Sequence, residues 1–268
     1  MTRVLHYGFP MVGLRDKKLP GKLIVVEGTD GVGRSTQIAL LREWLEANGY
    51  ATTETGMIRS DLAGAGIKKA KRGHTMSDLT LNLFYSTDFV DRLEKQIIPA
   101  LRAGFVVLTD RYIYSIIARA QVRGVDPRWI RDVLGFALIP DVVFYLRINV
   151  ENLIPRVVNS GGFDYWESGM DYLRGDDIYS NYIKYQTEIL NQFDSLAEEY
   201  HFHVVDANAG VTDVFCRLRD ALQIILSDMQ PPQTVGSGET HSGTDKKPKA
   251  GNTKPKNKKS LKTGRAMK

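Results

Sequence analysis

Residues 21–37 read GKLIVVEGTDGVGRSTQ, and this stretch decides the fold. It opens with the apolar run LIVV at 23–26, which has the length and the β-branched character of a buried parallel strand. Gly28, Gly31 and Gly33 then predict a tight turn, and the residues after them have the spacing of an amphipathic helix. In such a turn the backbone N–H groups point inward at an anion, and the positive end of the helix adds to the attraction. The stretch therefore predicts a phosphate-binding loop.

The loop matches the nucleotide-binding pattern G-x-x-x-x-G-K-[ST] except that Arg34 occupies the lysine position. An arginine can bind phosphate oxygens, but its wider, planar group does not place its charge where a lysine would. The hydroxyl of Ser35 is the natural Mg²⁺ ligand of such a loop. The residues expected to bind nucleotide phosphates are Gly28, Gly31, Val32, Gly33, Arg34, Ser35 and Thr36. The alternative is a glycine-rich turn that binds no ligand.

The composition is that of an ordinary folded protein with one basic end. Of the 268 residues 43% are apolar, and the single cysteine, Cys216, excludes an intrachain disulfide and a cysteine-rich metal site. No long uncharged apolar run and no secretory signal core occur, so we expect a cytoplasmic protein without membrane contact. Residues 246–268 carry ten Lys or Arg and no acid, which leaves 26 basic against 31 acidic residues elsewhere. The body of the chain therefore has no nucleic-acid signature by charge.

The alternation of strand and helix patterns predicts an α/β fold, a parallel β-sheet with helices on both faces. Beyond residues 23–26, strands are expected at 50–54, 105–108, 142–148 and 203–206. One helix is expected from the loop to about 48, and another follows the strand at 105–108 and ends at about 123. The other helices are expected at 61–72, 78–103 with a break near 99, 127–137, 152–158, 178–200 and 211–226. Residues 159–176 lack a clean period and predict a mobile lid. We divide the chain into an N-terminal extension (1–20), a nucleotide-binding domain (21–228) and a disordered Lys-rich tail (229–268).

Thr109-Asp110-Arg111-Tyr112 directly follows the strand predicted at 105–108. Open α/β sheets bind ligands at the carboxyl ends of their strands. A carboxylate and a guanidinium at that edge suit Mg²⁺ and an acceptor phosphate, so Asp110 is predicted to join Ser35 as a metal ligand. An Asp-Arg pair alone is more often solvated surface charge. The position after a buried strand favours the functional interpretation.

EGTDGVGRSTQ at 27–37 resembles the phosphate loop of thymidylate kinases, EGxDGxGKSTQ. Further matches to that family are DRY-x-x-S at 110–115, LFYSTD at 83–88, PAL at 99–101 and PDVVFYL at 140–146. Together the matches extend over roughly residues 20–226. The resemblance implies the P-loop kinase fold with a short lid, the use of ATP and Mg²⁺, and phosphoryl transfer to a nucleoside monophosphate, with dTMP to dTDP as the first candidate reaction.

The resemblance also implies roles for single residues. Asp30 matches the loop aspartate that contacts the sugar 3′-hydroxyl, and Tyr85 matches the aromatic residue that stacks on the base. Without the resemblance, core packing on an amphipathic helix would be the better interpretation of Tyr85. Catalytic roles are assigned to Arg34, Asp110, Arg111, Arg156 and Arg174. Substrate contacts are assigned to Asp30, Tyr85, Phe89, Arg111, Ser115 and Arg119.

The chain departs from the family where the base is read. Phe89 replaces the arginine that reads the base edge, and Arg119 and Ala120 replace a tyrosine and a glutamine. Thr53 replaces the arginine that binds the acceptor phosphate, although Arg59 lies near enough in sequence to substitute for it. Because stacking accepts any base, we expect weak discrimination of thymine. Arg119 either reads a new base edge or is a solvated helix side chain.

Two functions remain open at this stage. The first is an ATP- and Mg²⁺-dependent nucleoside monophosphate kinase, favoured by the loop glycines, Ser35 and the DRY sequence. The second is a nucleotide-binding regulatory protein with weak or no kinase activity, favoured by Arg34 and the altered base site. The partners we expect are ATP and a nucleoside monophosphate, a second copy of the chain in a homodimer, and nonspecific anionic contacts of the basic tail.

Overall fold

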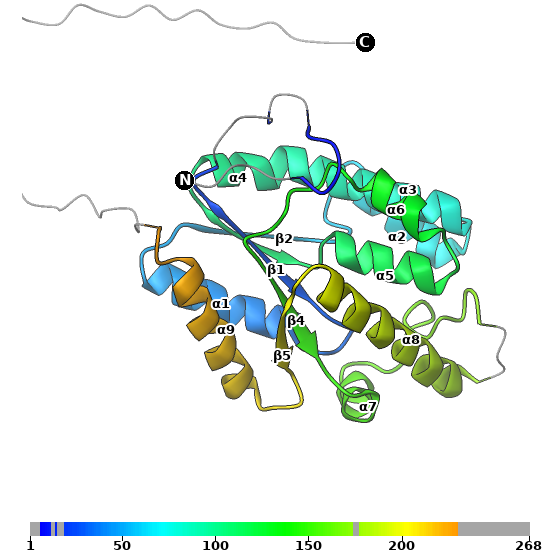
Figure 1. Cartoon of the computed structure of the whole chain (residues 1–268). Helices are drawn as coiled ribbons and strands as arrows, with labels where there is room; N and C mark the ends of the chain where they lie inside the picture. The colour runs from blue at the N-terminus through cyan, green and yellow to red at the C-terminus, as the bar shows by residue number, and fades with distance from the viewer. Residues whose placement is uncertain (1–5, 12–13, 15–18, 174–176, 230–268) are drawn as a thin grey trace, which may run out of the picture. The chain divides into compact units, whose positions relative to one another are not determined.

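A computed structural model describes residues 6–11, 14, 19–173 and 177–229 of the chain. Arg174 and nearly all of the predicted tail lie outside these ranges. Five strands form one parallel sheet in the order β2-β3-β1-β4-β5 (Figure 1). The strands are β1 (Lys22–Glu27), β2 (Thr52–Gly56), β3 (Val106–Asp110), β4 (Val142–Arg147) and β5 (His203–Asp206). Within the described ranges no helix is long and apolar enough to cross a bilayer.

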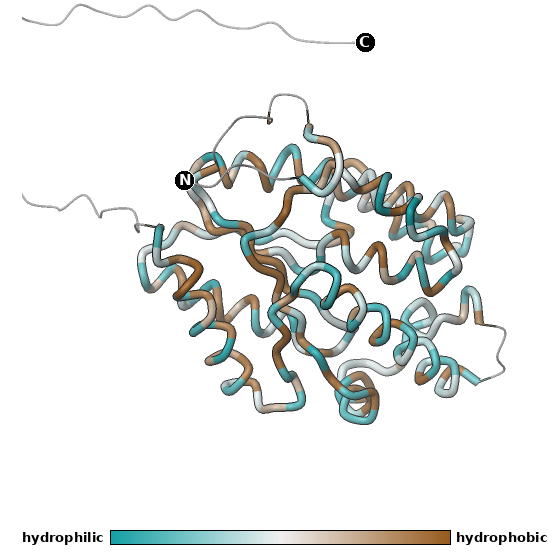
Figure 2. The backbone as a smooth tube through the Cα atoms, viewed as in Figure 1, coloured by the Kyte–Doolittle hydropathy of each residue, from teal (hydrophilic) through white to brown (hydrophobic). Residues whose placement is uncertain are grey.

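Alternate residues of β1 enter two separate hydrophobic cores. Leu23 and Val25 belong to the core on one face of the sheet, and Ile24 and Val26 belong to the core on the other. This division follows from the period of two along a strand. A strand covered on both faces needs a continuous apolar run, which is what the sequence provides. The most apolar backbone accordingly runs through the central strands (Figure 2).

Helices cover both faces of the sheet, which confirms the predicted fold class (Figure 1). The helices that pack on the face of Ile24 are α1 (Arg34–Ala47), α7 (Val150–Asn159) and α9 (Val211–Ile225). The helices that contribute to the opposite core are α2 (Gly64–Gly73), α3 (Asp78–Arg92), α4 (Ile98–Arg102), α5 (Ile113–Val122), α6 (Pro127–Val133) and α8 (Ile178–Glu199).

Several predicted boundaries differ from the structure, and two of the differences have local reasons. The break expected near Pro99 is instead a π-helical turn, η1 (Leu93–Ile97), that joins α3 to α4. Pro99 lies in the first turn of α4, where a missing N–H is tolerated, and the wider π turn accommodates its ring. The strand expected at 50–54 begins at Thr52. Tyr50 still donates its N–H to Leu45 O at 3.0 Å, so it belongs to the end of α1.

Part of the N-terminal extension packs against the domain. The Gly8 N–H donates to Gly135 O at 2.7 Å, and a Cβ on Gly8 would lie 3.1 Å from the Gly135 Cα. The hydroxyl of Tyr7 lies 2.5 Å from that of Tyr114, in the first turn of α5. Phe9, two residues further on, is 58% exposed. The extension is thus held by Tyr7 and by a close backbone contact, which a side chain at position 8 would have to push apart.

Tyr7→Ala should lower the free energy of unfolding by about 2–3 kcal/mol, because it removes a half-buried ring and leaves the Tyr114 hydroxyl without its partner. Tyr7→Phe removes only the hydrogen bond and should cost about 1 kcal/mol. Phe9→Ala, on an exposed ring, should change the value by less than about 0.5 kcal/mol. Urea unfolding measures all three variants. Equal losses for the Tyr7→Ala and Phe9→Ala variants would contradict the packing of the extension.

Candidate active site

The carboxyl ends of three neighbouring strands meet at one point of the sheet. Asp110, the last residue of β3, is in register with Val26 of β1 and with Gly56 of β2. The phosphate loop follows β1 directly, and Arg111 follows β3 directly, so both segments leave the sheet at this edge. Ligands of open α/β sheets bind at such an edge. The residues expected to carry chemistry therefore converge here.

The loop between β1 and α1 has the backbone of an anion cradle. Its three glycines have positive φ angles, which residues with a Cβ rarely adopt. A Cβ on Gly31 would also lie 2.6 Å from the side chain of Val157 in α7. Ser35 and Thr36 are exposed, and their N–H groups have no acceptor in the described part of the chain. The start of α1 thus presents free donors to an anion.

The Arg34 side chain is held by the loop itself. Its Nη1 donates to Gly28 O at 2.7 Å and also to Thr29 O, and its Nε donates to the Asp110 carboxylate at 2.7 Å. Only 9% of the side chain is exposed. The guanidinium therefore ties the end of β1 to the end of β3, and its charge partly neutralises Asp110.

The two predicted metal ligands lie side by side. Ser35 Oγ is 3.5 Å from Asp110 Oδ2. Mg²⁺ in nucleotide sites usually has one or two protein oxygens and completes its shell with phosphate oxygens and water. Across the described ranges no group of three or more His, Cys, Asp or Glu side chains could hold a metal ion. Ser35 and Asp110 thus fit a Mg²⁺ ion held mainly by a nucleotide, although the bond from Arg34 competes for Asp110.

Arg111 has an unusual backbone conformation, with φ at +69°. Its N–H donates to Val26 O at 3.0 Å, and its carbonyl accepts a hydrogen bond from the Thr109 hydroxyl at 2.8 Å. The next residue, Tyr112, donates its N–H to Glu27 at 2.8 Å. Strained residues of this kind cost about 1–3 kcal/mol and cluster at functional sites. The surrounding bonds keep the Arg111 side chain at the phosphate loop.

Asp30 lies among three guanidinium groups. Arg111 and Arg119 donate to its carboxylate, Arg119 at 2.5 Å, and an Arg34 nitrogen lies 3.8 Å away. With Asp110 as the only other carboxylate in direct contact with these arginines in the described ranges, the cluster has excess positive charge. Burial, with the nearby charge of Arg119, lowers the pKa of Arg111 to about 9. A phosphate group placed here would offset the crowding of cations.

Glu27, which the sequence analysis did not single out, is a fully buried carboxylate below the turn of Arg111. It accepts hydrogen bonds from Tyr112 N at 2.8 Å, Ser115 N at 3.2 Å and Ser115 Oγ at 2.6 Å. Burial raises the pKa of Glu27. Ser115 is 1% exposed and its hydroxyl points at Glu27, so its assignment as a substrate contact is wrong. Ser115 has no exposed surface for a ligand. Its bonds to Glu27 instead hold the turn of Arg111 in place.

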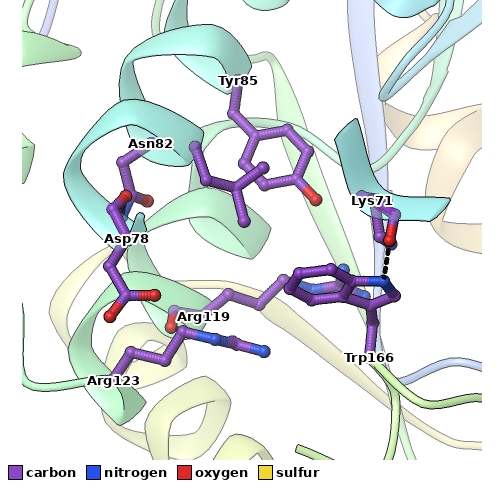
Figure 3. Close-up of a pocket in the computed structure, with 8 residues that line it drawn as sticks. Lys71, Asp78, Asn82, Tyr85, Arg119, Arg123 and Trp166 are labelled. Atoms are coloured by element: carbon purple, nitrogen blue, oxygen red, sulfur yellow. Dashed lines mark hydrogen bonds between the residues drawn. The ribbon is translucent and has the colours of Figure 1, made fainter. Parts of the chain in front are cut away.

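A small pocket lies between Tyr85 and Trp166 (Figure 3). Its lining comes from α2, α3, α5 and the segment after α7, and consists of Lys71, Asp78, Leu81, Asn82, Tyr85, Arg119, Arg123 and Trp166. Only Tyr85 and Arg119 were predicted. Helical spacing could have indicated more, because Asp78, Asn82 and Tyr85 share one face of α3, and Arg123 caps the end of α5 one turn after Arg119. Nothing local indicates Lys71 or Trp166, which come from distant segments.

Arg123 and Arg119 differ in how many of their N–H donors are free to bind a ligand. Arg123 makes a bidentate pair with Asp171 at 2.6 and 2.9 Å and donates to Tyr185 Oη at 2.9 Å. Arg119 donates through Nη2 to Asp30, and its other side-chain donors have no acceptor in the described part of the chain. Arg123 therefore forms a fixed wall, while Arg119 keeps donors for a ligand. Arg119 is therefore not a solvated helix side chain, which was the second interpretation of this residue.

Phe89 lies in the core and does not line the pocket. It is fully buried, and its ring contacts Tyr112 edge-on at 4.8 Å and stacks on Phe136 at 5.7 Å between centroids. Its assignment as a substrate contact is therefore wrong. Asn82, two turns earlier on α3, lies at the pocket instead.

Asp88, next to Phe89, shapes the loop after β2. Its carboxylate accepts two backbone N–H bonds from that loop, at 3.0 and 2.9 Å, and a bond from the buried Arg92 at 3.0 Å. The loop directs Arg59 back toward the sheet, where its Nε lies 3.3 Å from the position that a Cβ on Gly56 would take. Gly56 ends β2 beside the end of β3. This placement supports Arg59 as the substitute for the arginine that Thr53 replaces.

The segment after α7 forms turns through residue 173, and its predicted mobility stays a prediction. Arg156 on α7 donates to Val32 O at 3.0 Å and to Ala207 O at 2.7 Å. It therefore lies against the phosphate loop, where a catalytic arginine would have to be. Arg174 falls outside the described residues, so its role stays a prediction.

Lys71 makes the free energy of unfolding of the protein depend on pH. Burial lowers its pKa from the ordinary 10.5 to about 8, and its Nζ lies 5.5 Å from the centre of the Trp166 ring. Between about pH 8 and 10.5 the unfolded chain binds more protons here than the folded chain, so this group's contribution to stability rises with pH in that window. Lys71→Met should raise the free energy of unfolding at pH 7 by up to about 3 kcal/mol.

The gain from Lys71→Met should shrink as the pH rises toward 10, because wild-type Lys71 then loses its buried charge. Lys68→Met changes an exposed lysine on the same helix and is the matched control, with an expected change below about 0.5 kcal/mol at both pH values. Chemical unfolding at pH 7 and pH 10 measures the difference. A gain that does not vary with pH would contradict the lowered pKa of Lys71.

Comparison with known proteins agrees with this geometry. The family model "Thymidylate kinase" matches residues 26–217. The chain is 36% identical over 206 residues to "Probable thymidylate kinase 2" of Saccharolobus solfataricus, covering 75% of this chain and 95% of that protein. It is 31% identical over 196 residues to "Probable thymidylate kinase" of Pyrococcus horikoshii, covering 69% and 94%. The predicted resemblance is thus confirmed, and the chain belongs to the thymidylate kinase family of nucleoside monophosphate kinases.

Proposed function

We propose that this protein transfers the γ-phosphoryl group of ATP to a nucleoside monophosphate, with dTMP as the first candidate acceptor. The observation that carries the proposal is the cluster of Arg111 and Arg119 on Asp30. This cluster lies between the anion cradle of the phosphate loop and the pocket below Tyr85. A donor phosphate on one side and an acceptor phosphate on the other would both face guanidinium groups. The names of the relatives favour dTMP.

In this proposal the backbone of the loop and the start of α1 bind the phosphates of ATP. Ser35 and Asp110 would hold Mg²⁺, which supplies positive charge to the phosphate oxygens when bound. Arg111 stands at the end of β3 toward the acceptor phosphate, and Arg156 stands against Val32 of the loop. Arg174 would approach from the segment after α7. Phosphoryl transfer needs little more than this positioning and charge.

The acceptor would lie along a line from Asp30 to Tyr85. Asp30 is placed to accept a hydrogen bond from the sugar, once a ligand competes with the arginines for its oxygens. Tyr85 offers a ring to the base, and Arg119 offers its free donors to the base edge or the phosphate. Arg59 would contact the acceptor phosphate from the end of β2. The catalytic unit in this proposal is residues 21–228.

Two further expectations stay proposals. We propose a homodimer, for which Leu79 and Leu83 offer an exposed apolar stripe one turn apart on α3. We also propose that the Lys-rich tail makes nonspecific contacts with anions and that the protein works in the cytoplasm. Size-exclusion chromatography with light scattering tests the dimer directly.

A coupled ADP-release assay with ATP, Mg²⁺ and a panel of nucleoside monophosphates tests the function. ADP formation that depends on a monophosphate supports the kinase. ATP binding without acceptor-dependent turnover would contradict it and would favour the regulatory alternative, which no observation in the described residues supports over the kinase. Asp110→Asn serves as the inactive control, because it removes the carboxylate proposed to hold Mg²⁺.

Arg34→Lys should raise kcat several-fold. A lysine cannot keep the bonds to Gly28, Thr29 and Asp110 together, so it would free Asp110 for the metal and present a compact charge to the phosphates. Arg34→Ala should lower kcat by about a hundredfold, the usual effect of losing one transition-state donor. Arg42→Lys, on an exposed ion pair with Glu54, is the matched control and should change nothing. A fall in kcat for Arg34→Lys would mean that the fork of Arg34 itself stabilises the transition state.

The enzyme should discriminate poorly between bases. The pocket offers stacking surface and the free donors of Arg119, but Phe89 and Ala120 offer no polar group to a base edge. The ratio of kcat/KM for dTMP to that for dUMP, dCMP or dGMP should stay below about a hundredfold. Asn82→Ala tests whether the amide at the pocket reads a base. A larger preference for dTMP that Asn82→Ala abolishes would show that thymine is read by residues outside the family pattern.

A further inference from the structure

The cavity below Tyr85 is too small for its proposed ligand. Its volume is about 20 Å³, room for about one water molecule. A groove of about 550 Å³ lies next to it, lined by Ile58, the basic side of α2, and Asp164, Tyr165 and Trp166. Sites for drug-sized ligands have volumes of about 300–1,000 Å³. Of the two, only the groove has the volume of a nucleotide site, and only the small cavity has Tyr85 and, through Arg119, the path to Asp30.

Two residues, Lys71 and Trp166, line both cavities and so form the wall between them. The indole Nε1 of Trp166 donates to Lys71 O at 3.1 Å. The indole lies across the small cavity from Tyr85 (Figure 3). Removing the indole from this position would join the two cavities into one site bounded by Tyr85.

The contacts of the Trp166 ring come mainly from Lys71 and His74. The ring donates one hydrogen bond to Lys71 O, lies 5.5 Å from Lys71 Nζ, and stacks on the exposed His74 with 5.4 Å between ring centroids. It also meets the neighbouring Tyr165 edge-on and is partly buried against the core.

Gly161 and Gly162 join the segment of Trp166 to α7, have φ angles of 129° and 89°, and have open space where a Cβ would be. Two adjacent glycines in this conformation are suited to absorb a change of backbone direction, although Gly162 N–H also donates to Val157 O at 3.0 Å. The segment is anchored beyond Trp166, where Ser168 is fully buried and Glu167 O accepts a hydrogen bond from Gln186 at 2.7 Å, so the movement open to it is a local one of Trp166 and the residues before it.

We propose that Trp166 is an acceptor-contacting residue of this enzyme: it leaves its bond to Lys71 when a nucleoside monophosphate binds, and its indole then stacks on the base opposite Tyr85. The inference rests on the proposed function, because the ligand is the acceptor of that reaction. The ligand class is a planar base carrying a sugar phosphate. A base between two aromatic rings gains stacking on both faces, and stacking is tolerant of base identity.

Tryptophan fluorescence tests the contact directly. The chain has three tryptophans, so Trp44→Phe with Trp129→Phe leaves Trp166 as the only reporter. Titration of this double variant with dTMP and with dGMP, without ATP, should quench or shift the emission with the same Kd that calorimetry gives. The matched control retains only Trp129, by Trp44→Phe with Trp166→Phe, and should give no change.

Kinetics separate a contact from a structural role. Trp166→Ala should raise KM for the acceptor by about tenfold to a hundredfold and leave KM for ATP unchanged, and Trp166→Phe should recover most of the loss. Melting curves of both variants show whether they fold. If the alanine variant does not fold, Trp166→Phe, which keeps an aromatic ring, still tests the contact. Calorimetric binding with unchanged Trp166 emission would overturn the inference while the proposed function stands. If no nucleoside monophosphate of the panel binds, both this inference and the proposed function are overturned.

Discussion

A buried carboxylate holds the two halves of the site together. Glu27 ends β1 directly before the phosphate loop, and its oxygens bond the backbone of Tyr112 and both the backbone and the hydroxyl of Ser115 at the start of α5. Glu27 thus caps α5 from a different strand and satisfies N–H groups that a helix start leaves free. The loop and the turn of Arg111 cannot shift against each other without breaking bonds that no water can replace. The strained backbone of Arg111 is stable because of this constraint.

Arg34 changes the internal balance of the phosphate loop. A lysine at this position would offer one compact charge, whereas the guanidinium makes bonds to two loop carbonyls and to Asp110 at the same time. The loop is consequently well held before any ligand binds. The cost is that Asp110 is shared between an internal ion pair and its proposed metal. Binding of phosphates can therefore be nearly normal while the placement of the metal is altered.

The sequence predicts what is local and misses what depends on rotation and distance. The strand, the glycines and the helix at 21–37 form as expected, because the apolar run, the glycine spacing and the helical period are properties of that stretch itself, although Arg156 and Val157 of α7 also contact the loop. On α3, by contrast, Phe89 was placed in the site because it takes the position of the family's base-reading arginine. That match does not show which side of the helix faces a ligand, so Asn82 was missed. Ser115 was misassigned because its partner, Glu27, is 88 residues away in the chain. Trp166 reaches the pocket only through the tertiary path of the segment after α7.

The closed pocket bears on selectivity. Moving Trp166 away from Lys71 costs free energy. A ligand that causes this movement must therefore gain at least that much from contacts that exist only after Trp166 has moved. Stacking between Tyr85 and Trp166 is such a contact, and any planar base makes it, whereas a bare sugar phosphate does not. The excess positive charge around Asp30 attracts every phosphate ester alike. Under the proposed movement of Trp166, the cost of opening would select the base as a planar group, and a preference among bases would depend on the free donors of Arg119 and on Asn82.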